Sequence, residues 1–128
     1  MTGILFLCIH NAGRSQMAAG FARELSQGAV TILSGGSEPG ESVNPVAVEV
    51  MREVNIDIAG YVPQKYNDDL LQSVDVVVTM GCGDTCPYIP GKRYIDWPLD
   101  DPKGRPIEEV RVIRDQIRAN VAELLNQL

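Results

Sequence analysis

The sequence is poor in basic, histidine and aromatic side chains. Its 128 residues include 11 Lys and Arg against 17 Asp and Glu, one His, and 5% aromatic residues, so the net charge is −6. Nucleic acids and anionic membrane surfaces bind basic proteins, and we therefore expect neither as a partner. A bound metal is not expected either, because there is no histidine cluster and the three cysteines lack the spacing of a paired zinc site.

Long apolar runs are absent as well. No stretch approaches the ~20 apolar residues of a membrane-spanning helix, and no basic segment precedes a short apolar one, as in a secretory signal. We therefore expect a cytoplasmic protein, in which an odd number of cysteines indicates reactive or buried thiols rather than a disulfide framework. Without repeats or linkers, residues 1–128 are expected to form a single domain.

Apolar segments typical of buried strands alternate with segments of helical periodicity. Strands are predicted at residues 3–8, 30–33, 74–80 and 92–95. Helices are predicted from residue 15 to a stop at Gly28, at residues 45–54, in a brief turn capped by residues 67–69, and at residues 107–128. Strands that are apolar throughout and alternate with helices predict a parallel sheet covered on both faces. The predicted fold class is therefore α/β.

A short loop follows the first predicted strand, which ends at Cys8. Ligands of open parallel sheets bind beyond the carboxyl ends of strands, and backbone N–H groups at the start of the next helix favour an anion. Arg14 adds a planar fork for two oxygens of that anion. Ser15 is well placed to donate a hydrogen bond to a Cys8 thiolate, and Asn11 tolerates the unusual backbone angles of such a loop. The loop is therefore predicted to bind a tetrahedral oxyanion above a nucleophilic cysteine.

The alternative interpretation is that Cys8 is a small buried residue and Arg14 an exposed helix start. The C-x5-R motif is short, but the strand before it and the helix after it provide the context that the functional interpretation requires. His10 is the only histidine of the chain. It either tunes the charge of the anion or is a surface residue of the loop.

The segment "CIHNAGRSQMAAGF" resembles the phosphate-binding loop of the low-molecular-weight protein tyrosine phosphatase family, and its "RSQMA" part is similar to the arsenate reductase branch of that family. The segments "SGG", "VNPVAVEVMREVNIDIAG", "VDVVVTM" and "DWPLDDP" extend the resemblance over nearly the whole chain. It implies a three-layer fold, a four-stranded parallel sheet flanked by helices. It also implies that Cys8 is the nucleophile and that the oxyanion site consists of Ile9, His10, Asn11, Ala12, Gly13, Arg14 and Ser15.

A site of this type needs an acid that protonates the leaving oxygen. The segment "LDDPKG" offers Asp100 and Asp101, although Asp-Pro in a loop is otherwise an ordinary turn. The family that this chain resembles carries its catalytic acid on an Asp-Pro pair in this region. The resemblance therefore implies that Asp101 is the acid and that Asp100 is a solvated neighbour.

Two further thiols, Cys82 and Cys86, follow the most apolar predicted strand in a glycine-containing loop. They are either incidental thiols or, by the resemblance, members of a relay. In that relay Cys8 attacks arsenic, Cys82 displaces arsenite by attacking Cys8, and Cys86 resolves the new bond to leave a Cys82–Cys86 disulfide. The sequence departs from the thioredoxin-coupled branch, whose last two cysteines are further apart and which has a cysteine where Gly13 stands here.

The resemblance implies an arsenate reductase that also binds phosphate and sulfate and has weak phosphatase activity. It implies no tightly bound cofactor but an external reductant, either thioredoxin or a small thiol (mycothiol or glutathione) with a mycoredoxin- or glutaredoxin-type protein. A tyrosine phosphatase is the alternative, although Lys103 stands where phosphatases place aromatic residues. An anion-binding or redox-sensing module is disfavoured, because a binder needs no acid such as Asp101. We expect a monomer.

Overall fold

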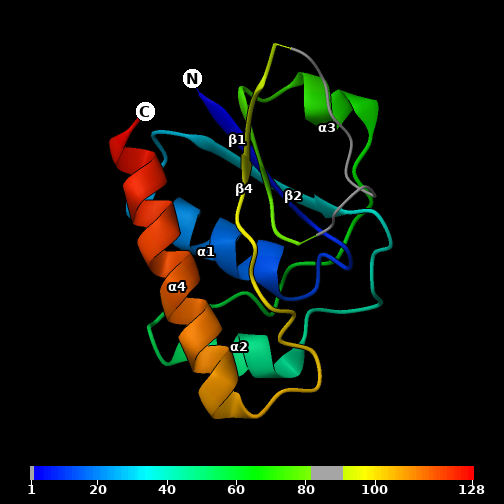
Figure 1. The fold of residues 1–128 in the computed structure, drawn as a ribbon, viewed down its shortest axis with the longest axis vertical. Helices are drawn as coiled ribbons and strands as arrows, with labels where there is room; N and C mark the ends of the chain where they lie inside the picture. Colours follow the sequence, from blue (N-terminus) through cyan, green and yellow to red (C-terminus); the bar gives the residue numbers. More distant parts are fainter. Residues whose placement is uncertain (1, 82–90) are drawn as a thin grey trace.

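The computed structural model describes residues 2–81 and 91–128 and has three layers, a sheet between two sets of helices (Figure 1). The elements are β1 (Gly3–Cys8), α1 (Arg14–Ser26), β2 (Thr31–Gly36), α2 (Pro45–Arg52), α3 (Asp68–Gln72), β3 (Val76–Thr79), β4 (Arg93–Asp96) and α4 (Ile107–Asn126). The sheet contains four strands in the order β2–β1–β3–β4, and each neighbouring pair is parallel. The α/β fold and the four-stranded parallel sheet expected from the sequence are thus confirmed.

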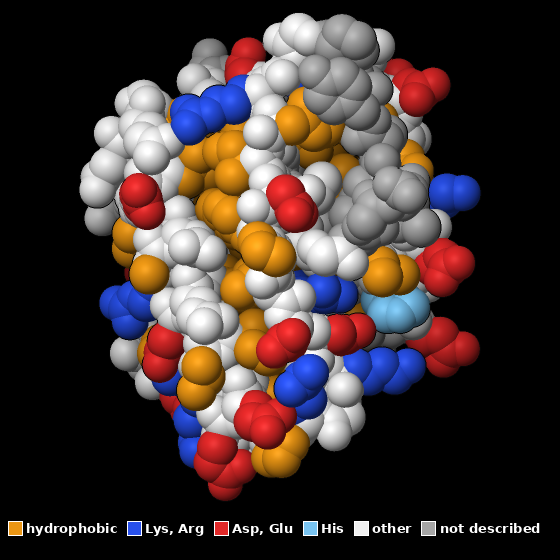
Figure 2. Space-filling model, viewed as in Figure 1, with side chains coloured by type: hydrophobic (Ala, Val, Ile, Leu, Met, Phe, Trp, Pro, Cys, Tyr) orange, Lys and Arg blue, Asp and Glu red, His pale blue; other side chains and the backbone are white. Residues whose placement is uncertain are grey.

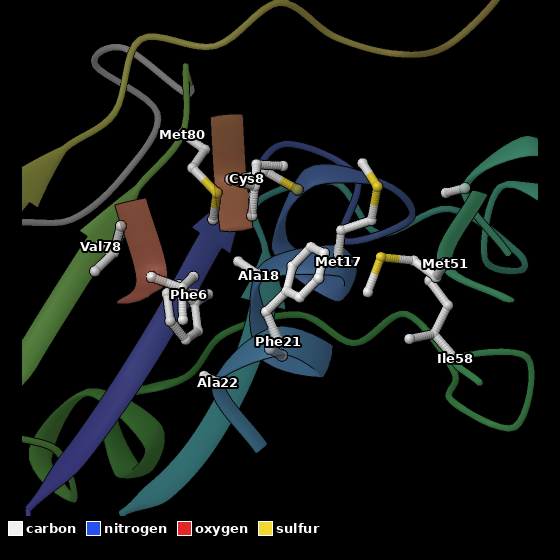
Figure 3. Packing of buried hydrophobic residues seen from close by; sticks show 14 of the residues in the cluster. Phe6, Cys8, Met17, Ala18, Phe21, Ala22, Met51, Ile58, Val78 and Met80 are labelled. Carbon is white, nitrogen blue, oxygen red and sulfur yellow. The ribbon is translucent and has the colours of Figure 1, made fainter. Parts of the chain in front are cut away.

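Strand β1 lies in the middle of the core, because all six of its residues are buried. Successive side chains of a strand point to opposite faces of the sheet. Accordingly, Phe6 packs in the cluster formed with α1, α2 and α4, to which Phe21 in Figure 3 also belongs, whereas Leu5 packs with Leu71 of α3 on the other face. Complete burial of each such side chain contributes roughly 1.5–3 kcal/mol to stability. This packing fixes the end of β1, and therefore Cys8, in the structure.

Helix α4 covers the same face of the sheet as α1 (Figure 1). Its apolar positions recur at helical spacing, and their side chains are buried: Val110, Ile113, Ile117, Val121 and Leu124. Leu128, which the sequence pattern assigned to this face, lies beyond the helix and is 47% exposed. No helix in the described part of the chain is long and apolar enough to cross a membrane.

The predicted caps are present at two helices. Asn44 Oδ1 accepts a hydrogen bond from the N–H of Val46 at the start of α2, and Asn67 Oδ1 accepts one from the N–H of Leu70 at the start of α3. Helix α1 ends before Gly28, whose φ of 84° is in the left-handed region that glycine adopts without strain.

Several boundaries differ from the sequence prediction. Strand β2 continues through residues 34–36 instead of ending at Leu33, because these residues pair with residues 6–8 of β1. A Cβ atom on Gly36 would lie 2.6 Å from the carbonyl oxygen of Ile9, so only glycine allows β2 to pass this close to the loop after β1. Strand β3 is shorter than predicted, β4 is shifted by one residue, and α2 ends two residues before Val54.

Candidate active site

The loop after β1 connects Cys8 to the first residue of α1, Arg14, and is held from outside by the segment 38–44. The carbonyl oxygens of Ile9, His10 and Ala12 accept hydrogen bonds from the N–H groups of residues 38, 40 and 44, at 2.8, 2.9 and 2.7 Å. By contrast, the N–H groups of residues 9–13 donate to no backbone carbonyl oxygen within residues 2–81 and 91–128. With the carbonyls engaged outward, these N–H groups and the N-terminus of α1 are available to an anion.

A chain of side-chain hydrogen bonds leads to the thiol. Asn11 has a left-handed φ of 50°, and its Nδ2 donates to Ser15 Oγ at 2.7 Å. Ser15 Oγ in turn lies 2.9 Å from Cys8 Sγ. Both residues are completely buried and Cys8 is 2% exposed. A thiolate has no proton to give, so the Ser15 hydroxyl is the donor whenever Cys8 is ionised. The contact of Ser15 with Cys8 and the unusual backbone angle of Asn11 are those expected from the sequence, whereas the hydrogen bond from Asn11 to Ser15 was not predicted.

Arg14 is 4% exposed and is positioned by two distant segments. Its Nη1 donates to the carbonyl oxygen of Leu99 at 3.1 Å, and its Nη2 lies 3.7 Å from Asp101 Oδ2. Gly81, with a φ of 77°, packs so closely on the guanidinium that a Cβ atom there would lie 2.5 Å from Nη1. The guanidinium is therefore held at the start of α1 with its charge directed to the loop and to Asp101.

Asp101 approaches from the segment between β4 and α4. Its Oδ1 accepts a hydrogen bond from the N–H of Lys103 at 3.0 Å, and its carbonyl oxygen accepts one from Arg105 Nε at 2.9 Å. The next residue, Pro102, is buried against the loop, because a Cβ atom on Gly13 would lie 2.9 Å from Pro102 Cγ. The Asp101 side chain remains 45% exposed and faces Arg14. Its neighbour Asp100 is exposed, as the sequence predicted.

These residues surround a pocket of about 440 Å³ whose lining includes Cys8, Arg14 and Asp101. His10 also lines it, and His10 Nδ1 lies 2.9 Å from the carbonyl oxygen of Glu38. Figure 2 shows acidic and basic side chains gathered around this single histidine. Among the described residues no Phe, Tyr or Trp lines the pocket, and the exposed Lys103 is at its edge. The described lining therefore combines charged side chains with apolar ones and contains no aromatic ring.

Cys82 and Cys86 lie outside the described residues. The segment that leads to them begins beside the site, because β3 pairs with β1 and the N–H of Met80 donates to the carbonyl oxygen of Leu7. Gly81, the last described residue before them, contacts Arg14. Within the described ranges no group of three or more His, Cys, Asp or Glu side chains could hold a metal ion.

Two glutamines support the loop in a way that the sequence did not reveal. Gln16, 1% exposed, donates from Nε2 to the carbonyl oxygen of Asn11 at 3.1 Å and to Asn11 Oδ1 at 3.2 Å. The backbone N–H of Gln64 donates to the same Oδ1 at 3.0 Å. Gln16 belongs to the quoted segment "RSQMA", but nothing in that segment indicates contact with Asn11. The contact of Gln64 uses its backbone and so leaves no side-chain signal.

Residues 3–128 match the family described as low molecular weight phosphotyrosine protein phosphatase. A glutaredoxin arsenate reductase from Synechocystis is similar to this chain, at 35% identity over an aligned length of 131 positions. The alignment covers 100% of this chain and 99% of that protein. An arsenate reductase from Staphylococcus epidermidis, named arsenate reductase 2, is 37% identical over 122 residues, covering 92% of each chain.

Solved structures show the same similarity. A thioredoxin-dependent arsenate reductase from Corynebacterium glutamicum superposes with a TM-score of 0.88 at 35% identity. The match covers 99% of this chain but only 61% of that protein, so this chain spans less than two thirds of its length.

Proposed function

Because the chain belongs to the low molecular weight phosphotyrosine protein phosphatase family, we propose that it is an enzyme that reduces arsenate to arsenite with Cys8 as its nucleophile. The observation that carries this proposal is the hydrogen-bond chain from Asn11 through Ser15 to Cys8, at a pocket that Arg14 and Asp101 also line. The choice of arsenate as substrate is supported by the names of the similar proteins, which are arsenate reductases.

In the first step the loop binds arsenate through its backbone N–H groups and through Arg14. The Cys8 thiolate attacks arsenic, an arsenic–oxygen bond breaks, and the oxygen leaves as water after Asp101 gives it a proton. Arg14 Nη2 lies 3.7 Å from Asp101 Oδ2. A bound anion would pair with the Arg14 guanidinium in place of Asp101, so that Asp101 could carry the proton that it gives to the leaving oxygen.

In the second step a thiol attacks the sulfur of Cys8. The electron pair of the sulfur–arsenic bond goes to arsenic, which leaves as arsenite, while Cys8 becomes part of a disulfide. We propose that Cys82 is the attacking thiol and that Cys86 then resolves the Cys8–Cys82 bond. The resulting Cys82–Cys86 disulfide would be reduced by an external thiol protein. Support for such a reductant comes from one similar protein named thioredoxin-dependent and another named for glutaredoxin.

The test is arsenate-dependent NADPH consumption with thioredoxin and its reductase. Parallel reactions contain glutathione or mycothiol with a glutaredoxin- or mycoredoxin-type protein. The proposal expects turnover with one of these systems and none for a Cys8→Ser variant. An aryl phosphate is offered in the same experiment as the phosphatase substrate. Fast hydrolysis of the aryl phosphate without any arsenite would replace the proposal with a phosphatase.

A further inference from the structure

The side-chain amide of Asn11 accepts two hydrogen bonds and donates a third. Its Oδ1 accepts from Gln16 Nε2 at 3.2 Å and from the N–H of Gln64 at 3.0 Å, while its Nδ2 donates to Ser15 Oγ at 2.7 Å. Rotating the amide by half a turn would point its NH₂ group at two donors and its oxygen at Ser15. The two donors therefore fix which end of the amide faces Ser15.

This orientation determines what Ser15 offers to Cys8. Because Ser15 Oγ accepts a hydrogen bond from Asn11 Nδ2, its own hydroxyl proton is free to point to Cys8 Sγ, 2.9 Å away. A hydrogen bond donated to a thiolate is charge-assisted and stabilises the ionised form. The reactivity of the thiol thus depends on the two groups that donate to Asn11 Oδ1, Gln16 Nε2 and the N–H of Gln64, although neither contacts the thiol.

A glutamine at position 16 is unfavourable for stability unless its side-chain N–H groups are needed to bind Asn11. The side chain is 1% exposed, and its Oε1 has no hydrogen-bond partner among the described residues. A buried polar atom without a partner is destabilising, whereas methionine has a similar length and buries without this penalty. We propose that Gln16 is a positioning residue that, through Asn11 and Ser15, keeps the Cys8 thiolate in its reactive form. The inference rests on the proposed function insofar as Cys8 is the nucleophile.

The experiment replaces Gln16 with methionine and measures alkylation of Cys8 by iodoacetamide, with the Cys8 peptide quantified by mass spectrometry. At neutral pH we expect the alkylation rate to fall about tenfold. This is the effect of losing one hydrogen bond to a charged group, here the bond from Ser15 to the Cys8 thiolate. At about pH 10, where thiols ionise without help, the difference should disappear. The variant keeps every other charged or titratable group that lines the pocket with Cys8: His10, Arg14, Glu41, Asp101 and Lys103.

Two further variants separate positioning from folding. Met17→Leu changes the adjacent buried residue of α1, which belongs to the apolar cluster and makes no hydrogen bond to Asn11, and should leave Cys8 alkylation unchanged. Gln64→Ala removes the hydrogen bond from Gln64 Nε2 to the carbonyl oxygen of Ser34, 2.8 Å long, that holds the second donor in place. Gln64 is exposed, so this variant should fold and should slow alkylation at neutral pH by about twofold to threefold.

The inference is wrong if Gln16→Met alkylates at the wild-type rate at neutral pH. It is also wrong if the loss is equal at both pH values or if Met17→Leu shows the same loss. If Gln16→Met does not fold, a wild-type rate for Gln64→Ala overturns the inference. Alkylation does not involve arsenate, so a wild-type protein that fails to reduce arsenate would contradict the proposed function without affecting this result.

Discussion

Replacing Gly13 with alanine tests whether Asp101 must lie where the structure has it. A Cβ atom on residue 13 would lie 2.9 Å from Pro102 Cγ and 3.6 Å from Pro102 Cδ. Carbon atoms without a bond prefer separations of about 3.5–4.0 Å, so Pro102 has to move by roughly 0.6 Å or more. The proline ring is closed onto the backbone nitrogen, so its Cγ cannot rotate away as the end of a free side chain would, and Asp101 directly precedes it. Asp101 must therefore move with it.

Misplacing a catalytic group by about 1 Å can reduce a rate roughly a hundredfold. For the smaller shift here we expect formation of the Cys8–arsenic adduct to slow about tenfold, or about 1.4 kcal/mol in activation free energy. Affinity for arsenate or sulfate should change less than about threefold, because the backbone N–H groups and Arg14 are retained.

The assay is rapid quenching of a single turnover followed by mass spectrometry of the Cys8 adduct, with anion affinity measured by calorimetry. Gly40→Ala is the matched control, because Gly40 lines the same pocket and a Cβ atom there would meet Ala12 Cβ at an ordinary 3.7 Å. The reasoning is refuted if Gly13→Ala forms the adduct at the wild-type rate, or if its anion affinity falls as much as its rate.

Four other variants test the remaining parts of the site. Arg14→Lys should weaken sulfate binding about tenfold or more in calorimetry, because an ammonium replaces a planar fork that is fixed by Leu99; unchanged affinity would remove Arg14 from the oxyanion site. Asp101→Asn should slow adduct formation about a hundredfold or more with little change in anion affinity, since the acid acts only as oxygen leaves; equal losses in quenched-flow rate and affinity would indicate a structural role instead. Cys82→Ser should stop after one turnover with arsenic or a mixed thiol on Cys8, and Cys86→Ser should accumulate a Cys8–Cys82 disulfide. Mass spectrometry distinguishes these products, and full multiple-turnover activity of both variants with a small thiol would disprove the relay.

The sequence predicted the segment from β1 to α1 well, because its information is local. A continuous apolar run predicts a buried strand, and Cys8, Asn11, Arg14 and Ser15 are close enough in the chain for one loop to bring them together. Strand β2 was predicted too short for the opposite reason. Glycine has a low intrinsic preference for strands, and the end of β2 is a strand only because it pairs with β1.

Apart from the local side-chain contact of Gln16 with Asn11, the parts of the site that the sequence did not reveal are long-range contacts through the backbone. The N–H of Gln64 reaches Asn11 across 53 residues, and the carbonyl oxygen of Leu99 reaches Arg14 across 85. Every residue has a backbone N–H or carbonyl group, so no residue pattern marks the ones that are used. The packing of Pro102 on Gly13 likewise depends on how the segment after β4 returns to the loop. The local sequence alone therefore did not identify Asp101 as the acid; only the resemblance to the family did.

The most direct test of the proposed function is arsenite formation from arsenate, with dithiothreitol as a reductant that is independent of any partner protein. Wild-type protein is compared with Cys8→Ser after subtraction of the reaction without protein. A serine hydroxyl cannot replace the thiolate at neutral pH, and serine fits the volume of the buried thiol. We predict steady arsenite formation by the wild type and none by a folded Cys8→Ser variant. Arsenite formation by Cys8→Ser at a rate comparable to the wild type, or its absence from both, would contradict the account.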